Sequence, residues 1–362
     1  FPDGISFLIL VFISVLILFT ILGNSFVLLA FIVDKRLRSQ SDFILLNLAI
    51  CDFLIGAFTS PLYIPYMLTG KWILGKFVCK LWLTADYTIS TASVFNIVLI
   101  SYDRYLSVTK TVLYRSLQNK HSTTFLSMGA VWILSFILYG PAVIFWENSF
   151  INSNGSVNIC VAGFNNIWYV QFGTSCFDFV LPLISISFFN LSIYWNLRRR
   201  SRKKSQNFCS QSSKGKEKET TISTIATNSV LASTQLCGTK NSGPSGQKGT
   251  MLVHVFCLGS RNTSSEIDSD GRINHMNIQL SNLSRDAKVA KSLSVLVSVF
   301  VICWAPCTCL ISIRAACRGY CVDPFWYDLT LWMLYLNSTI NPILYPFCHK
   351  SFKKAFQLIL KK

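Results

Sequence analysis

The sequence has few charged residues. Of 362 residues, 14% are Asp, Glu, Lys or Arg, whereas 51% are hydrophobic. An ordinary soluble domain carries about 25% charged residues, so the deficit argues against a soluble protein. A chain largely dissolved in lipid has this composition, because charges are costly in hydrocarbon.

Several functional constellations are also missing. No Cys/His spacing suggests a metal site, and no apolar segment holds the nucleophile–base pair of an enzyme. The last apolar run contains no lysine for a retinal Schiff base. The internal repeats and Gly/Pro-broken helix pairs of secondary transporters are absent.

Seven apolar runs are present, each long enough for the roughly 20 residues of a membrane-spanning helix. They predict an all-α membrane protein with a seven-transmembrane helix bundle. The first run contains Asn24 and is too long for a signal peptide. Because the sequence starts at Phe1 rather than Met, we expect a trimmed amino terminus. The runs are Ile5–Val33, Phe43–Met67, Phe77–Val108, Thr124–Trp146, Ile167–Leu197, Val289–Ala316 and Phe325–Phe347.

The 33 basic residues outnumber the 16 acidic ones, and most of the basic clusters flank one end of the apolar runs. Basic residues favour the cytoplasmic side, so the amino terminus is predicted to be extracellular. The charge also attracts anionic lipid, and we expect no nucleic-acid partner. The clusters occupy 34–38, 110–120, 198–204 and 349–356.

These features divide the chain into four parts. Residues 1–198 hold spans one to five, with an outer loop at 147–166. Residues 199–284 are rich in Ser, Thr, Asn, Gly and Lys and predict a disordered, basic third cytoplasmic loop. Residues 285–348 hold spans six and seven, and 349–362 predict an amphipathic helix on the membrane surface.

The outer side carries two candidate disulfides. Cys79 opens span three and Cys160 lies in the large outer loop, where the oxidising environment favours a Cys79–Cys160 bond. Cys317 and Cys321 flank a short outer loop, but their spacing also fits two free thiols. Asn154 begins the outer glycosylation sequon "NGS".

Two carboxylates interrupt the outer halves of the spans. Asp86 lies two turns below Cys79, on the face that Ser90 continues. A lone intramembrane carboxylate predicts a cationic ligand; the alternative is a neutral acid bonded only to Tyr335. Asp178, one turn below Thr174, either binds a second ligand end or tunes packing as a protonated acid.

Two further polar groups lie deeper. Asp52 in span two is expected near oxygen- and nitrogen-bearing side chains of other spans, as a sodium pocket or a wet polar network. Its predicted neighbours are Asn24, Ser93, Asn337, Ser338 and Asn341. Asp103, Arg104 and Tyr105 lie about 25 Å below Asp86. There Arg104 is predicted to alternate between Asp103 and Asp286 as a charge latch.

Together these motifs resemble the rhodopsin-like G-protein-coupled receptors, over all seven spans but not the long cytoplasmic loop. The matching motifs are "GN" at Asn24, "LAICD" at Asp52, Cys79, "DRY" at 103–105, Trp132, Pro182, "CWAP" at 303–306, "NPILY" at 341–345 and "FKKAFQLILKK". Asp86 and Tyr335 match the amine-binding pair of aminergic receptors. "LYGPAVIFWE", "FFNLSIYWNLRRR" and similar stretches look closest to the third and fourth histamine receptor subtypes.

The resemblance implies a plasma-membrane, multi-pass histamine receptor coupled to a Gi/Go-type G protein, with arrestin and a receptor kinase as further partners. The only ion implied is an allosteric sodium. Implied ligand-binding residues are Asp86, Tyr87, Ser90, Thr174, Asp178, Trp304, Thr308, Trp332 and Tyr335. Implied switch residues are Asp103, Arg104, Tyr105, Asp286, Trp304, Pro306 and Tyr345.

Two positions depart from the family pattern. Asp178 stands where these subtypes usually carry the longer Glu that meets the imidazole, and Cys307 replaces a common tyrosine. Another biogenic amine, or an orphan receptor that signals without ligand, therefore remains an alternative. Catecholamines are disfavoured, because Ser175 alone represents the span-five serines of catecholamine receptors.

Overall fold

The computed structural model describes residues 3–118, 121–146, 150–153, 157–165, 167–214, 271–317, 321–348 and 350–360. The chain divides into two compact units. The first unit comprises Phe1–Ile193 and Lys288–Lys362, and the second comprises Tyr194–Ala287.

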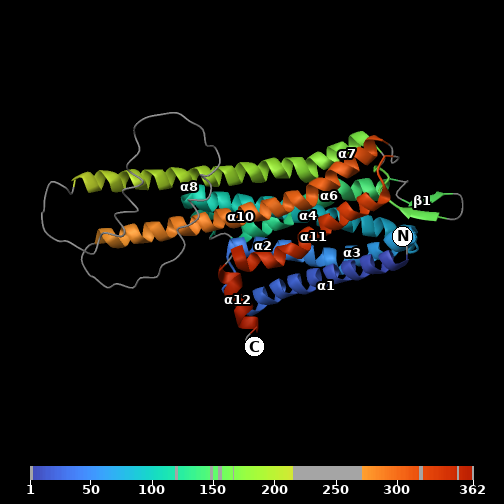
Figure 1. Ribbon diagram of the computed structural model, residues 1–362, viewed down its shortest axis with the longest axis horizontal. Coiled ribbons are helices and arrows are strands. Elements are labelled where there is room, and N and C mark those ends of the chain that lie inside the picture. Colours follow the sequence, from blue (N-terminus) through green and yellow to red (C-terminus); the bar gives the residue numbers. More distant parts are fainter. Residues whose placement is uncertain are drawn as a thin grey trace. The chain divides into compact units, whose positions relative to one another are not determined.

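Long helices account for all seven predicted spans (Figure 1). Six of them have the length and hydropathy of a membrane-spanning helix. The seventh is α11, whose mean hydropathy is lowered by the polar residues Asn337, Ser338 and Asn341. The helices are α1 (Asp3–Val33), α2–η1–α3 (Gln40–Leu54, Ile55–Thr59, Ser60–Thr69), α4 (Gly75–Thr109), α6 (His121–Phe145), α7–η3–α8 (Trp168–Ser175, Cys176–Val180, Leu181–Lys214), α10 (Gly271–Ala316) and α11 (Pro324–Cys348).

Local sequence signals place the ends of span two. Ser39 caps α2, where its hydroxyl accepts from the Asp42 backbone N–H while the Asp42 carboxylate accepts from the Ser39 backbone N–H. At the other end Gly70 adopts a left-handed conformation, with φ of 66°, which glycine reaches without a Cβ clash. Between these ends η1 is a π-helical segment.

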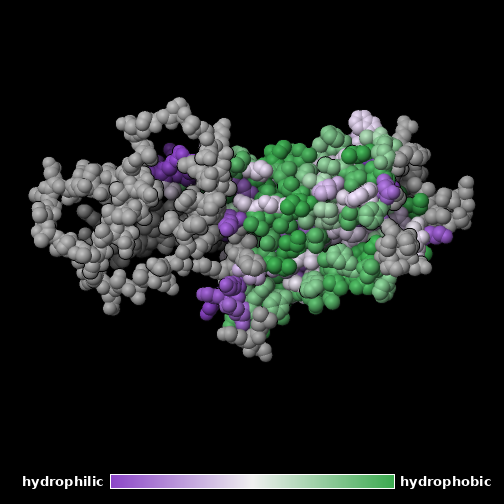
Figure 2. Space-filling view, viewed as in Figure 1, coloured by the Kyte–Doolittle hydropathy of each residue, from purple (hydrophilic) through white to green (hydrophobic). Residues whose placement is uncertain are grey.

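Helix α4 is the centre of the bundle and packs against α2 and α6, while α1 packs against α2 and α11. The outward faces of the helices are strongly apolar. Phe12, Leu126 and Ile137 are 63%, 73% and 60% exposed. Figure 2 shows hydrophobic side chains covering the middle of the visible helices. An exposed apolar surface of this extent fits a lipid environment.

The outer loop between α6 and α7 forms a two-stranded antiparallel hairpin of β1 (Phe150–Ser153) and β2 (Val157–Cys160), with Phe150 opposite Cys160. The predicted Cys79–Cys160 disulfide is present and ties this hairpin to the start of α4. A second disulfide joins Cys317 and Cys321. The glycosylation prediction at Asn154 lies outside the described residues.

Two short helices lie outside the spans. Helix α5 (Thr111–Gln118) follows α4 directly. Helix α12 (Lys350–Leu360) packs against α1 and α11, as Figure 1 shows near the carboxyl terminus. Its Phe352 and Ala355 are buried, whereas Lys353 and Lys354 are exposed. The predicted amphipathic helix is therefore present.

The second unit contains the continuation of α8 to Lys214 and the beginning of α10 at Gly271. Both ends of the predicted disordered loop, 199–284, are thus helical. Helix propensity explains the difference: Arg, Lys, Gln and Ser in 199–214 tolerate a helix once the apolar part of α8 has nucleated it. Residues 215–270 lie outside the described residues.

Candidate ligand-binding site

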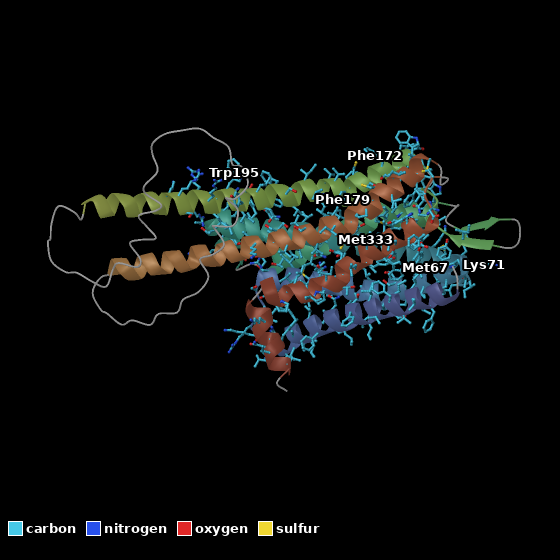
Figure 3. All side chains as sticks on the ribbon, viewed as in Figure 1. Met67, Lys71, Phe172, Phe179, Trp195 and Met333 are labelled. Carbon is cyan, nitrogen blue, oxygen red and sulfur yellow. A yellow bond between two sulfur atoms is a disulfide. The ribbon has the colours of Figure 1, made fainter. Side chains whose placement is uncertain are left out.

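A cavity of about 570 Å³ opens at the outer end of the first unit. Its wall comes from α3, α4, α6, η3, α10 and α11, together with the outer loop. Figure 3 shows Met67, one of the lining residues, beside Lys71 at this end, while Phe172 lies on the exterior. A volume of this size suits a small-molecule ligand.

Asp86 lines the cavity from α4. Its carboxylate accepts a hydrogen bond of 3.0 Å from the Tyr335 hydroxyl of α11, and the Thr59 hydroxyl also interacts with it. Both partners are neutral. Among the residues that the structure describes, no lysine, arginine or histidine forms an ion pair with Asp86. Within the described part of the chain, the fold therefore places no basic partner on Asp86.

Asp178 lines the same cavity from η3. One of its carboxylate oxygens accepts a hydrogen bond from the Tyr139 hydroxyl of α6. The other accepts from the Thr91 hydroxyl of α4, at 3.2 Å. The fold therefore places two carboxylates in one cavity, each held by neutral hydroxyl groups. Sequence reasoning missed Tyr139 and Thr91, which lie on other helices and carry no motif.

An aromatic cluster packs between the two carboxylates. Tyr87, adjacent to Asp86, stacks on Tyr139 with ring centroids 4.8 Å apart and an interplanar angle of 19°. Phe164 of the outer loop packs against both rings, at 5.7 and 6.2 Å. The Tyr87 hydroxyl donates to Asn165 Oδ1 at 3.1 Å. The segment after Cys160 is thus part of the cavity wall, a role that spacing alone did not indicate.

Seven of the nine sequence-predicted ligand-binding residues line the cavity: Asp86, Tyr87, Ser90, Asp178, Trp304, Thr308 and Tyr335. Ser90 Oγ and Trp304 Nε1 are buried and have no hydrogen-bond partner among the described residues. The Thr308 hydroxyl instead donates to the Trp304 carbonyl of its own helix, at 2.9 Å.

Thr174 and Trp332 do not line the cavity. The Thr174 hydroxyl donates to the Gln171 carbonyl of its own helix at 3.0 Å. Trp332 turns toward α3, where its indole N–H donates to the Met67 sulfur at 3.2 Å. Helical spacing predicts Thr174 on the face of Asp178, and the family resemblance implies Trp332 as a ligand contact.

The mouth of the cavity holds charged residues that sequence reasoning missed. Asp328 of α11 accepts a hydrogen bond of 2.7 Å from the Tyr63 hydroxyl. The Arg314 guanidinium lies 4.5 Å from the centre of the Tyr327 ring, in a cation–π arrangement. Cys307, the residue that departs from the family pattern, is fully buried in the cavity wall.

Asp52 lies in a separate, closed polar layer. Its carboxylate accepts hydrogen bonds from Ser93 at 3.2 Å and from Asn341 at 2.8 Å, and Ser338 also interacts with it. Asn24 instead donates to the Ser338 carbonyl, and no hydrogen bond joins Asn337 to Asp52 among the described residues. Carboxylate and hydroxyl oxygens around Asp52 suit a hard cation, so the residues present fit a sodium ion.

At the cytoplasmic end Arg104 Nε lies 3.7 Å from Asp103 Oδ2. Asp103 also accepts a 2.6 Å hydrogen bond from Ser41, whose hydroxyl is 3.2 Å from that of Tyr114. Burial raises the pKa of the Tyr114 hydroxyl, which lies outside the spans in α5, so this hydroxyl stays protonated. The Asp286 side chain lies outside the described residues, and the latch stays a prediction.

The other predicted switch residues occupy distinct places. Tyr105 packs against Phe189 at 5.4 Å between ring centroids. Pro306 lies inside α10, two residues after Trp304. Tyr345 is buried, with its ring 5.9 Å from that of Phe352 in α12.

Comparison with known proteins adds an independent finding. The model of the seven-transmembrane receptor family of the rhodopsin type matches residues 23–345. The human histamine H4 receptor is 38% identical over 95% of this chain and 90% of its own length, and the mouse H4 receptor is 38% identical over 93% and 88%. The pig muscarinic acetylcholine receptor M1 is 26% identical over 96% and 87%.

Proposed function

The chain belongs to the rhodopsin family of seven-transmembrane receptors, and from this premise we propose that it is a receptor for histamine. As a member of that family it is a multi-pass protein of the plasma membrane and not an enzyme. The observation that carries the proposal is the pair of carboxylates, Asp86 and Asp178, in one cavity with only neutral partners.

Histamine has two ends that suit this pair. Its ammonium group binds Asp86, and a charge-assisted hydrogen bond in such a site contributes a few kcal/mol, about 1.5–3. The Tyr335 hydroxyl holds the carboxylate in place. The imidazole end donates to Asp178. The Ser90 hydroxyl and the Trp304 N–H, which have no hydrogen-bond partner in the described residues, offer further polar contacts in the same cavity.

The similarity to histamine H4 receptors supports this ligand over others. A second candidate is another small amine, because the muscarinic relatives also match most of the chain. That ligand would need only the Asp86 subsite. A third candidate is a receptor that signals without a ligand. A binding assay in which none of the tested amines binds would favour this candidate.

Signalling requires an element with two states. We propose that bridging α4 and η3 by the ligand repacks Trp304 near Pro306, where proline already removes a backbone hydrogen bond of α10. The cytoplasmic part of α10 then moves outward, and Arg104 leaves its interaction with Asp286. The exposed cleft accepts the tail helix of a Gi/Go-type G protein. Arrestin and a receptor kinase would recognise the same active state.

Asp52, Ser93 and Ser338 would hold a sodium ion, and the buried Asn341 Oδ1 would add a further oxygen donor. The bound ion would supply a positive charge that stabilises the ionised Asp52. Since these residues come from α2, α4 and α11, they would hold the three helices in their inactive packing.

One experiment tests the ligand directly. Membranes containing the full chain are incubated with radiolabelled histamine, which is displaced by a panel of amines with and without a second polar end. We expect histamine to bind more tightly than acetylcholine and phenethylamine. Tighter binding of a one-ended amine, or no saturable histamine binding, would contradict the proposal.

A further inference from the structure

The Asp178 carboxylate does not stand alone in the cavity wall. Tyr139 and Thr91 each donate to one of its oxygens, so two different helices, α6 and α4, hold a side chain that belongs to η3. A short aspartate in a π-helical segment is thereby fixed at both oxygens. The direction in which Asp178 faces is set by its neighbours as well as by its own helix.

Tyr139 is well suited to fix this direction. Its side chain is only 2% exposed, and its ring packs against both Tyr87 and Phe164, which also contact each other. A stacked, buried ring has few alternative rotamers, so the position of its hydroxyl is rigid. Thr91, by contrast, holds the other oxygen at 3.2 Å from a small side chain.

The same ring also connects the two subsites. Tyr87, which stacks on Tyr139, directly follows Asp86 in α4. Asp86, Tyr87, Tyr139 and Asp178 are therefore linked in series by covalent bonds, one ring stack and one hydrogen bond, and these links set the separation between the two carboxylates. The separation determines which ligand lengths fit, because an interior packed to crystal density does not adapt its spacing continuously.

We infer that Tyr139 is a positioning residue that aims the Asp178 carboxylate into the cavity and so selects amines with a hydrogen-bond donor at their second end. This inference rests on the proposed function for its ligand class. It concerns a residue on α6 that contacts Asp178 through its hydroxyl and Tyr87, the neighbour of Asp86, through its ring.

The central test compares Tyr139→Phe with the unaltered receptor in binding of histamine and phenethylamine. Removal of one hydrogen bond to an ionised group should weaken histamine about tenfold, while phenethylamine affinity should change less than about twofold. The exposed Tyr169 offers a matched control, and Tyr169→Phe should change neither affinity.

Three other results of this binding comparison would contradict the inference. Equal losses for both amines would show that Tyr139 only supports the fold, and unchanged histamine affinity would show that its hydroxyl positions nothing. Increased histamine affinity would show that Tyr139 competes with the ligand for Asp178. Each of these three outcomes overturns the inference.

A ligand-free measurement separates this inference from the proposed function. The thermal unfolding midpoint of the detergent-solubilised receptor is measured for Tyr139→Phe, Asp178→Ala and the double variant. If Tyr139 acts through Asp178, Tyr139→Phe should lower the midpoint in the unaltered receptor but not in the Asp178→Ala background. Equal lowering in both backgrounds would overturn the inference, whereas failure of histamine to bind any receptor would overturn the proposed function alone.

Discussion

The outer cavity and the polar layer around Asp52 both bury carboxylates in the helical bundle, yet they satisfy them differently. Asp52 is completely buried and accepts hydrogen bonds from residues of α4 and α11. Asp86 interacts with the Tyr335 and Thr59 hydroxyls and faces a cavity of about 570 Å³. Side chains of neighbouring helices enclose the Asp52 carboxylate. The Asp86 carboxylate instead borders a cavity with room for a positively charged molecule.

This difference shows why intramembrane carboxylates cannot be interpreted by residue type alone. Asp52, Asp86 and Asp178 all lie in apolar runs, and burying any of them without a partner is costly. What separates a ligand subsite from an ion or water site is the space next to the oxygens. That space depends on which helices approach and which side chains they bring.

Asp86→Asn should have the largest effect. The change removes the charge and keeps the shape, so an ammonium ligand loses its ion pair, a loss of about 2–5 kcal/mol. We expect histamine affinity to fall at least about 30-fold in saturation binding, with surface expression maintained.

Asp328→Asn is the matched control for that experiment, because Asp328 lines the same cavity near its mouth and already has Tyr63 as a partner. Its effect should be much smaller. If Asp86→Asn retained the affinity of the unaltered receptor, Asp86 would not bind the ammonium group. The outer cavity and the layer around Asp52 would then not differ in the role of their carboxylates.

Asp178→Ala should have the next largest effect and should distinguish ligands. Histamine should lose about 10- to 100-fold in affinity, since one of its two anchors disappears, while phenethylamine should lose little. Competition binding with both amines measures the ratio. Equal losses would mean that Asp178 supports packing rather than the second ligand end, and Asp178→Glu should preserve the ratio.

Asp52→Asn addresses the closed layer. Sodium chloride should lower histamine affinity of the unaltered receptor about fivefold relative to N-methylglucamine chloride at equal ionic strength. The variant should lose this sodium effect, because its neutral amide no longer favours a cation. Persistence of the sodium effect in Asp52→Asn would place the ion elsewhere and leave the layer as a hydrogen-bonded network.

Asp286→Ala should have the smallest effect and extends the comparison to the cytoplasmic end. Loss of an interaction worth about 0.5 kcal/mol should raise ligand-free G-protein activation about twofold, measured as nucleotide exchange on a Gi/Go-type protein. Arg104 retains Asp103 as a partner in both receptors. Unchanged basal exchange would argue against the latch.

Much of the architecture could be predicted because it follows from local properties. Apolar length predicts spans, and Cys79 and Cys160 pair as expected. Asp86 and Tyr335 also meet as expected. Thr174, one turn before Asp178, does not line the cavity that Asp178 lines, and its hydroxyl donates to the Gln171 carbonyl instead.

Other parts of the site had no local signal. Tyr139, Thr91 and Asn165 look like ordinary residues of a span or loop, yet the first two hold Asp178 and the third holds Tyr87. Trp332 appeared to face the ligand but packs against Met67. Such partnerships depend on the rotation of each helix about its axis, which a pattern of apolar residues restricts only to a broad face.

By itself the sequence determined that the chain crosses a membrane in helices and carries uncompensated carboxylates within it, because transfer of side chains to lipid is a property of each segment alone. The tertiary structure decided which carboxylate faces an open cavity, which is enclosed, and which tyrosines hold them. Those outcomes arise from contacts between helices distant in sequence, where close packing and hydrogen-bond geometry choose the partners.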